Sequence, residues 1–282
     1  MKLSVIIATH DRPDALERLI ASLNPQLNPG REIIVAENGT PAPATLPSAD
    51  APILHLHDPR PGKCRIQNRA IEAARGEILA FLDDDLTVGP RYLDAVEKFF
   101  ESHPEFAAMA GRIVPAEDPA SRAGALWVYL DLPIVDRGSE VIEVRGVLGA
   151  NMAFRAAALR QAGPFDERLG PGAGGHEEET EMSARLKRAG FRIGYAPEAI
   201  AYHEVDPARA DRERFIRVSR ERGRCRMLHE RHSAIEVLTK LVVARVRLAI
   251  AHGAGASLER IAREERRLAV ARGMFDGLGT RN

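Results

Sequence analysis

The apolar run at residues 78–82, Ile-Leu-Ala-Phe-Leu, is followed directly by three aspartates, Asp83, Asp84 and Asp85. A run of this length and composition is typical of a buried strand. The carboxylates therefore lie at its carboxyl end, where open α/β sheets bind their ligands. Three adjacent acids repel one another unless a positive group lies between them. A hard divalent cation fits this pattern because it prefers carboxylate oxygen and bridges to phosphate, and an acidic turn that caps the next helix is the alternative.

Around this run, apolar strands alternate with amphipathic helices. The pattern predicts an α/β fold whose mostly parallel sheet is flanked by helices on both faces. Strands are expected at residues 3–8, 32–36, 53–57, 78–82, 106–114, 147–154, 191–195 and 199–203, and helices at residues 13–23, 63–75, 90–102 and 176–188. Residues 115–138 are expected to be irregular, and a helical extension follows from residue 207.

The composition limits the partners and the compartment. The chain has 282 residues, of which 45% are apolar and 28% are charged, and its formal net charge is zero. This neutral composition gives no reason to expect a nucleic-acid partner. The two cysteines, Cys64 and Cys225, form neither a disulfide framework nor a zinc spacing, which favours a cytoplasmic location. The N-terminus does not read as a signal peptide, and no stretch reaches the roughly 20 apolar residues that span a bilayer.

An ordered series of sequence blocks resembles the family-2 glycosyltransferases, which are inverting enzymes of the glycosyltransferase A fold. The blocks are SVIIATHDRP, IIVAENG, GKCRIQNRAIEAARGEILAFLDDD, GANMAFR before GPFDE, HEEETEMSARLKRAGF and AIAYHEV. The resemblance extends from about Leu3 to Val205. It implies a nucleotide-sugar-binding half at residues 1–115 and an acceptor-binding half at residues 116–206. Residues 207–282 would form a basic helical extension.

The resemblance assigns Thr9, Arg12 and Glu37 to the nucleoside of the donor. The carboxylate of Glu37 can accept a hydrogen bond from a base N–H, which favours uracil or thymine and therefore a UDP or dTDP sugar. Aspartate is the usual residue at this place in the family. A strand-end surface acid is the alternative interpretation of Glu37.

Lys63, Arg65 and Asn68 match a segment that lies near the donor in such enzymes. Arg65 has the planar guanidinium that can pair with a diphosphate in a bidentate manner. The alternative for Lys63 is a solvated charge at the surface of a helix.

Within the resemblance, Asp83 and Asp85 are the two ends of a DxD metal motif that holds Mn²⁺ or Mg²⁺. Asp83 also faces the donor, and Asp84 points away or holds the loop. His203 matches a histidine that relatives place beside the metal from a later strand, although a strand histidine is more often a core residue. The metal would stabilise the negative charge on the leaving nucleoside diphosphate.

An inverting transfer needs a base that takes the proton of the acceptor hydroxyl, and the family uses the second acid of a Glu-Asp pair at a helix start. Here the match falls on Glu178 and Glu179, so Glu179 is expected to be the base and Glu178 to orient the acceptor, with Glu177 as the alternative base. Glutamate in place of aspartate moves the carboxylate by about one C–C bond, and a displacement of about 1 Å can cost about 100-fold in rate. An acidic first turn that complements the helix dipole is the plain alternative. The glycine-rich loop at residues 170–175 is expected to close over the donor.

The C-terminal residues 209–272 hold more arginine than acid and mix apolar with basic positions at helical spacing. An interfacial helix on an anionic membrane, close to a lipid-linked acceptor, is one interpretation. Packing on the catalytic domain and dimerisation are the other two.

We therefore expect a metal-dependent inverting glycosyltransferase that moves a hexose-type sugar to a hydroxyl of a saccharide or lipid-linked acceptor. One rival is a sugar-phosphate nucleotidyltransferase, which needs a basic glycine-rich loop after the first strand, where this chain has ATHDRPDAL. The other rival is a non-catalytic nucleotide-sugar-binding module, which the glutamates at positions 37 and 179 keep open.

Overall fold

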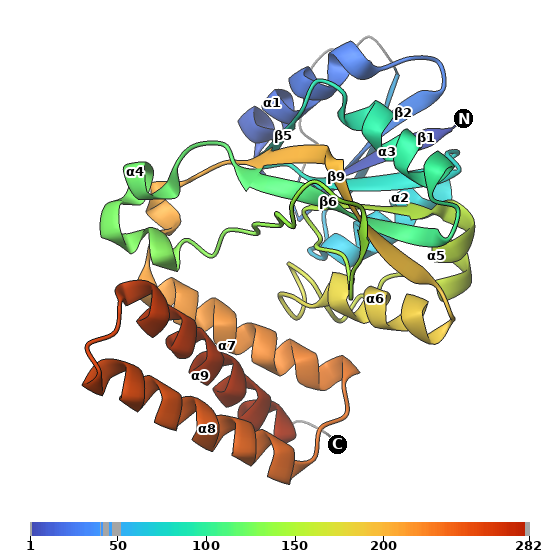
Figure 1. The fold of residues 1–282 in the computed structure, drawn as a ribbon. Helices are drawn as coiled ribbons and strands as arrows, with labels where there is room; N and C mark the ends of the chain where they lie inside the picture. The colour runs from blue at the N-terminus through green and yellow to red at the C-terminus, as the bar shows by residue number, and fades with distance from the viewer. Residues whose placement is uncertain (1, 40, 42–44, 47–51, 280–282) are drawn as a thin grey trace. The chain divides into compact units, whose positions relative to one another are not determined.

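The computed structural model describes residues 2–39, 41, 45–46 and 52–279 and divides into two compact units (Figure 1). The first unit comprises Met1–Ala116, Pro133–Ala173 and Glu178–Glu204. Its elements are β1 (Leu3–Thr9), α1 (Pro13–Leu23), η1 (Asn24–Gln26), β2 (Arg31–Asn38), β3 (Ile53–Asp58), α2 (Lys63–Ala73), β4 (Ile78–Asp83), β5 (Leu86–Val88), α3 (Tyr92–Ser102), β6 (Phe106–Pro115), β7 (Ile142–Glu143), β8 (Asn151–Arg155), α5 (Ala156–Ala162), α6 (Glu178–Arg188) and β9 (Arg192–His203).

The second unit comprises Glu117–Leu132, Gly174–Glu177 and Val205–Asn282. Its elements are α4 (Pro119–Ala123), η2 (Gly124–Tyr129), η3 (Pro207–Arg209), α7 (Arg212–His229), α8 (Ala234–Gly253) and α9 (Leu258–Leu278). None of the described helices is long and apolar enough to cross a membrane.

In the described residues, the strands form one nine-stranded sheet in the order β3-β2-β1-β4-β8-β6-β9-β5, and β7 pairs with β9. Pairing is parallel from β3 to β4 and again between β6 and β9, whereas β8 runs antiparallel to both of its neighbours. The α/β fold flanked by helices is therefore confirmed. The prediction of a mostly parallel sheet holds for strands β1 to β4. The rest of the sheet mixes parallel and antiparallel pairs.

Side chains alternate between two cores because successive residues of a strand point to opposite faces. In β1, Val5 and Ile7 join the core under α1 and α3, whereas Ile6 joins the core under α2, α5 and α6. Figure 1 shows these two groups of helices on opposite faces of the sheet. The strands are apolar on both faces for this reason, which leaves their carboxyl ends as the place for polar side chains.

Strand β9 is continuous where two short strands were expected. Its pairing with β6 shifts register, so that Gly111 lies opposite Ala196 while the next residue, Arg112, lies opposite Ile200. The buried amide of Asn151 fills this irregularity by donating to the carbonyls of Arg112 and Ala199, each at 3.0 Å. A β-carbon at Gly111 would stand only 2.2 Å from Asn151 Nδ2, so this position requires glycine.

Other sequence-based boundaries are also wrong. The short strands β5 and β7 were missed, and β8 begins four residues later than expected. Helix α4 and the 3₁₀ segment η2 lie within residues 115–138, which were expected to be irregular. Helix α6 begins at Glu178 rather than His176, because Glu177 has a φ of 77°, which lies outside the helical region.

In the second unit, α9 lies between α7 and α8 and packs against both (Figure 1). The crossing of α7 and α9 is unusually close at two glycines. A β-carbon at Gly223 would stand 2.0 Å from the carbonyl oxygen of Val270, and one at Gly273 would stand 1.9 Å from that of Arg220. The predicted helical extension is confirmed, and its helices approach to backbone contact because both residues lack a side chain.

Candidate active site

Asp83 is the last residue of β4, and Asp84 and Asp85 form the turn that leads to β5. Strand β5 then pairs antiparallel with β9, which places Leu86 opposite His203. The backbone N–H of Glu204 donates to the carbonyl of Asp85 at 3.0 Å. The sheet register therefore brings His203 beside Asp85, as the sequence predicts for one site.

Asp84 holds the end of β1 next to this turn. It is 4% exposed and accepts hydrogen bonds from Thr9 Oγ1 at 2.8 Å and from Arg12 Nη1 at 3.0 Å. Burial raises the pKa of Asp84, and the nearby Arg12 and Thr9 offset that effect only in part. Arg12 also donates to Asp85 Oδ2 at 3.1 Å, so the predicted nucleoside residues and the aspartate turn form one hydrogen-bonded group.

Lys63 connects this group to the acidic start of α6. Its Nζ lies 2.6 Å from Asp83 Oδ1 and 3.8 Å from Glu178 Oε1, and its side chain is only 11% exposed. Burial alone would lower the pKa of Lys63, but the carboxylates of Asp83 and Glu178 outweigh burial and raise it. Lys63 is therefore a buried ammonium shared by two carboxylates and not a solvated helix charge.

Glu178 and Glu179 occupy the first turn of α6 in different surroundings. Glu178 is 5% exposed and faces Lys63, whereas Glu179 is half-buried. A β-carbon at Gly149 would stand 3.8 Å from both Glu178 Oε1 and the Glu179 carboxyl carbon, so both carboxyl groups lie against this glycine. Ser183 fixes the helix here by donating to the Glu179 carbonyl at 2.7 Å and accepting from Val147 N–H at 3.1 Å. Of the two acids, Glu179 is the more open to a substrate.

Glu177, the alternative base, belongs to the second unit and is paired there. Its carboxylate accepts from Arg226 Nη2 at 2.9 Å and lies 3.5 Å from His229 Nε2. Burial would raise the pKa of Glu177, but His229 and Arg226 together lower it. A carboxylate held in this way is a weak proton acceptor, so the structure favours the neighbouring acids as the base.

Glu37 lies beside Thr9 in the β1–β2 register and is only 2% exposed, so it is not a surface acid. Its Oε2 lies 2.9 Å from His55 Nε2, a partner on β3 that the sequence analysis missed. The signal for His55 was a polar residue inside an otherwise apolar strand, in Ile-Leu-His-Leu-His. His55 therefore fixes the orientation of the Glu37 carboxylate.

Asn68 and Arg65 contact the segment before the glycine-rich loop. Asn68 exchanges two hydrogen bonds with the backbone of Phe165, at 2.8 and 3.0 Å, and Arg65 Nε lies 3.3 Å from Glu167 Oε2. Arg65 Nη1 also donates to the carbonyl of Pro61 at 3.2 Å, and none of the described contacts of either side chain is with the aspartates. The same loop packs on the start of α2, where Lys63 N–H donates to the carbonyl of Pro171 at 2.9 Å.

The donor set at Asp85 and His203 suits a divalent cation. His203 Nδ1 lies 2.8 Å from the carbonyl of Glu204, which can only accept, so Nδ1 donates this hydrogen bond. The other ring nitrogen, Nε2, lies 3.4 Å from Asp85 Oδ1 and is the atom that could ligate a cation. No group of three His, Cys, Asp or Glu residues in the described part of the chain could hold a metal alone. A cation here would complete its shell with water and donor phosphate, as Mg²⁺ commonly does.

Comparison with known proteins identifies the family. The model of Glycosyl transferase family 2 matches residues 4–163, which is 160 of the 282 residues. The chain belongs to this family.

Among curated relatives of this glycosyltransferase, a pre-mycofactocin glycosyltransferase of Mycobacterium tuberculosis is 29% identical over 214 residues, which cover 71% of this chain and 42% of that protein. A glucosyl-dolichyl phosphate glucuronosyltransferase of Haloferax volcanii is 22% identical over 218 residues, which cover 73% and 70% of the two chains. This chain thus spans less than half the length of the first relative.

Among solved structures, the mannosyltransferase PcManGT from Pyrobaculum calidifontis, in complex with GDP-Man and Mn²⁺, matches with a TM-score of 0.66. The match covers 100% of this chain and 88% of that one at 15% identity. This likeness confirms the expected glycosyltransferase fold. The assignment of individual site residues rests on the geometry above and remains a prediction.

Proposed function

We propose that this glycosyltransferase is metal-dependent and inverting, and that it transfers a sugar from a nucleoside diphosphate to a hydroxyl acceptor in one in-line displacement. The observation that carries the proposal is the single cluster in which Lys63 joins Asp83 to Glu178, with Glu179 alongside. Lys63 thus connects Asp83, the acid proposed to face the donor, to the helix start that carries the candidate base.

In this mechanism, Glu179 accepts the proton of the acceptor hydroxyl while the oxygen of that hydroxyl forms a bond to the anomeric carbon. The bond from the anomeric carbon to the phosphate oxygen breaks on the opposite face, and the electron pair leaves with the nucleoside diphosphate. Asp85 and His203 would hold the divalent cation, with Asp83 facing the donor. When bound, Mn²⁺ or Mg²⁺ supplies Lewis-acid stabilisation of the leaving diphosphate. Glu178, fixed by Lys63, orients the acceptor.

The nucleoside would lie against Thr9, Arg12 and Glu37 at the ends of β1 and β2. A buried carboxylate at Glu37 favours a base that presents an N–H, and we propose UDP or dTDP sugars as the first donors to test. Guanine also presents N–H groups, and PcManGT was solved with GDP-Man, so a GDP sugar belongs in the same test. A lipid-linked acceptor is suggested by the dolichyl phosphate named for the Haloferax relative.

Thermal unfolding with UDP, dTDP, GDP and CDP, each with and without Mn²⁺, tests the donor site. A ligand at about 100 times its dissociation constant stabilises a protein by about 2.7 kcal/mol. We expect a metal-dependent shift with one diphosphate, and its loss in Asp85→Asn. The matched control is Glu17→Gln, which changes an exposed acid on α1. A shift that persists in Asp85→Asn, or none with any diphosphate, would overturn the proposed site.

A further inference from the structure

Helix α8 carries a stripe of large apolar side chains on the face opposite its packed one. On the packed face, Leu241 and Ala244 join Leu268 and Ala271 of α9 in a small core. The outward side chains recur every three or four residues, which keeps them on one side of the helix. They are exposed by 45–78%: Ile235, Leu238, Val242, Val243, Val246 and Ile250. Single exposed apolar residues are ordinary, but a continuous stripe marks an interaction surface.

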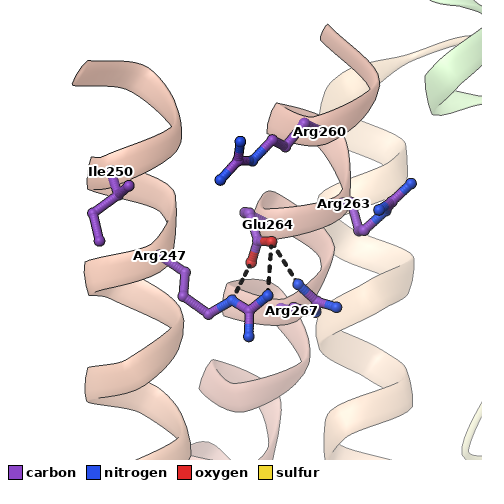
Figure 2. Close-up of a pocket in the computed structure, with 6 residues that line it drawn as sticks. All are labelled: Arg247, Ile250, Arg260, Arg263, Glu264 and Arg267. Atoms are coloured by element: carbon purple, nitrogen blue, oxygen red, sulfur yellow. Dashed lines mark hydrogen bonds and ion pairs between the residues drawn. The ribbon is translucent and has the colours of Figure 1, made fainter. Parts of the chain in front are cut away.

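A basic pocket of about 340 Å³ adjoins the C-terminal end of this stripe. Four arginines, one glutamate and one apolar residue line it, and Figure 2 shows them on α8 and α9: Arg247, Ile250, Arg260, Arg263, Glu264 and Arg267. Ile250 belongs to both features, so the pocket and the stripe are continuous. The pocket has four positive groups against one carboxylate, which makes it a site for an anion.

The four arginines of the pocket fall into two groups of two, which differ in whether Glu264 holds them. Glu264 is 4% exposed and holds Arg247 and Arg267 through ion pairs, drawn as dashed lines in Figure 2. Burial would raise the pKa of Glu264, but the two arginines lower it, so the carboxylate stays charged and fixes both. Among the described residues, no hydrogen bond or ion pair engages the guanidinium of Arg260 or Arg263. These two arginines are the ones left to bind an external anion.

We propose that the α8 stripe and the arginine pocket form a docking surface for an anionic phospholipid bilayer. The stripe would enter the interface between headgroups and acyl chains, and the pocket would take a headgroup phosphate, which arginine binds in a bidentate manner. Charge complementarity and the continuity through Ile250 favour a bilayer as the occupant. A free phosphate would engage the arginines but would leave the six apolar side chains exposed to water. The inference is independent of the proposed sugar transfer.

Co-sedimentation of the whole chain with vesicles tests the docking surface. We expect binding to phosphatidylcholine vesicles that contain phosphatidylglycerol, weaker binding at high salt, and little binding to phosphatidylcholine alone. At about 1 kcal/mol per basic residue near an anionic surface, Arg260→Ala with Arg263→Ala should reduce partitioning by roughly 30-fold. The matched control removes two exposed arginines elsewhere, Arg91→Ala with Arg217→Ala, and should bind like the wild type.

A second pair of substitutions tests the apolar stripe. Val242→Ser with Val246→Ser should lower vesicle binding by at least about tenfold. Its control is Leu126→Ser with Leu228→Ser, two similarly exposed leucines outside α8. Equal binding to neutral and anionic vesicles, or no binding to either, would refute the proposal. So would vesicle binding unchanged by the valine substitutions, which would indicate a phosphate site alone. A lipid-free dimer that these substitutions dissociate would assign the stripe to a second copy instead.

Discussion

Replacing Glu179 with glutamine should slow sugar transfer strongly while leaving the fold and the donor site intact. Glutamine keeps the size of the side chain but cannot take the proton of the acceptor hydroxyl. General-base catalysis contributes about 10²–10⁴-fold, which corresponds to roughly 2.7–5.4 kcal/mol of activation free energy. Ser183 donates to the backbone carbonyl of Glu179, which the substitution keeps. We therefore expect kcat to fall by that factor, with a loss of unfolding free energy no larger than the roughly 1 kcal/mol that is usual for a point substitution.

The neighbouring substitution, Glu178→Gln, provides the contrast. Glu178 is buried 3.8 Å from Lys63, so its neutralisation removes one of the two carboxylates that the buried ammonium faces. Loss of a buried charged partner costs about 1–3 kcal/mol, so we expect Glu178→Gln to lower stability. Because Glu178 orients the acceptor and does not take the proton, its loss of kcat should be smaller than that of Glu179→Gln. The assay is release of nucleoside diphosphate with acceptor present, beside thermal unfolding with diphosphate and Mn²⁺. If Glu179→Gln kept kcat within about threefold of the wild type, the base assignment would be wrong.

Three further predictions concern stability. Lys63→Met leaves the buried carboxylate of Glu178 and the partly exposed one of Asp83 without the ammonium between them, so unfolding free energy should fall by about 3–5 kcal/mol. A loss below about 1 kcal/mol in denaturant titration would contradict this. Glu32 has a pKa below its ordinary 4.5 because hydrogen bonds from Ser4 and Arg75 outweigh the effect of burial. Its contribution to stability is therefore complete above pH 4.5 and is lost as the pH falls through the pKa of the folded state. The difference in unfolding free energy between the wild type and Glu32→Gln should shrink from pH 7 toward acid, and a constant difference would refute this. Gly273→Ala should destabilise although alanine normally favours a helix, since the new methyl would meet a carbonyl at 1.9 Å; an unchanged or raised midpoint in urea would show that α7 and α9 can separate without loss.

The local sequence predicts the elements whose apolar pattern is complete. Helix α1 begins and ends where its spacing indicates, and strand β4 ends at Asp83, one residue after its apolar run. The acids at the carboxyl end of this strand could be assigned to a site for the same reason. These features depend on residues next to one another in the chain.

Features that depend on distant partners could not be predicted in the same way. Nothing in the sequence around Lys63 shows that its ammonium pairs with Asp83, 20 residues later, and lies close to Glu178, 115 residues later. The start of α6 depends on one backbone torsion at Glu177, which carries no composition signal. The partner of Glu37, His55, required the β2–β3 register.

The register irregularity in β9 lies between the residues that pair first with β6 and His203 at the candidate site. The number of residues in this irregular segment matters more for the site than their identity. Residues before it are fixed by pairing with β6, and His203 after it is fixed by pairing with β5. Side chains alternate along a strand, so one residue added at positions 197–199 would turn His203 to the opposite face unless the loose segment took it up. Asn151 holds that segment in place by donating to the carbonyl of Ala199 within it and to the carbonyl of Arg112 on the neighbouring strand β6. The place of the candidate metal ligand is thus set by an amide in the middle of the sheet, well before the strand reaches the aspartates.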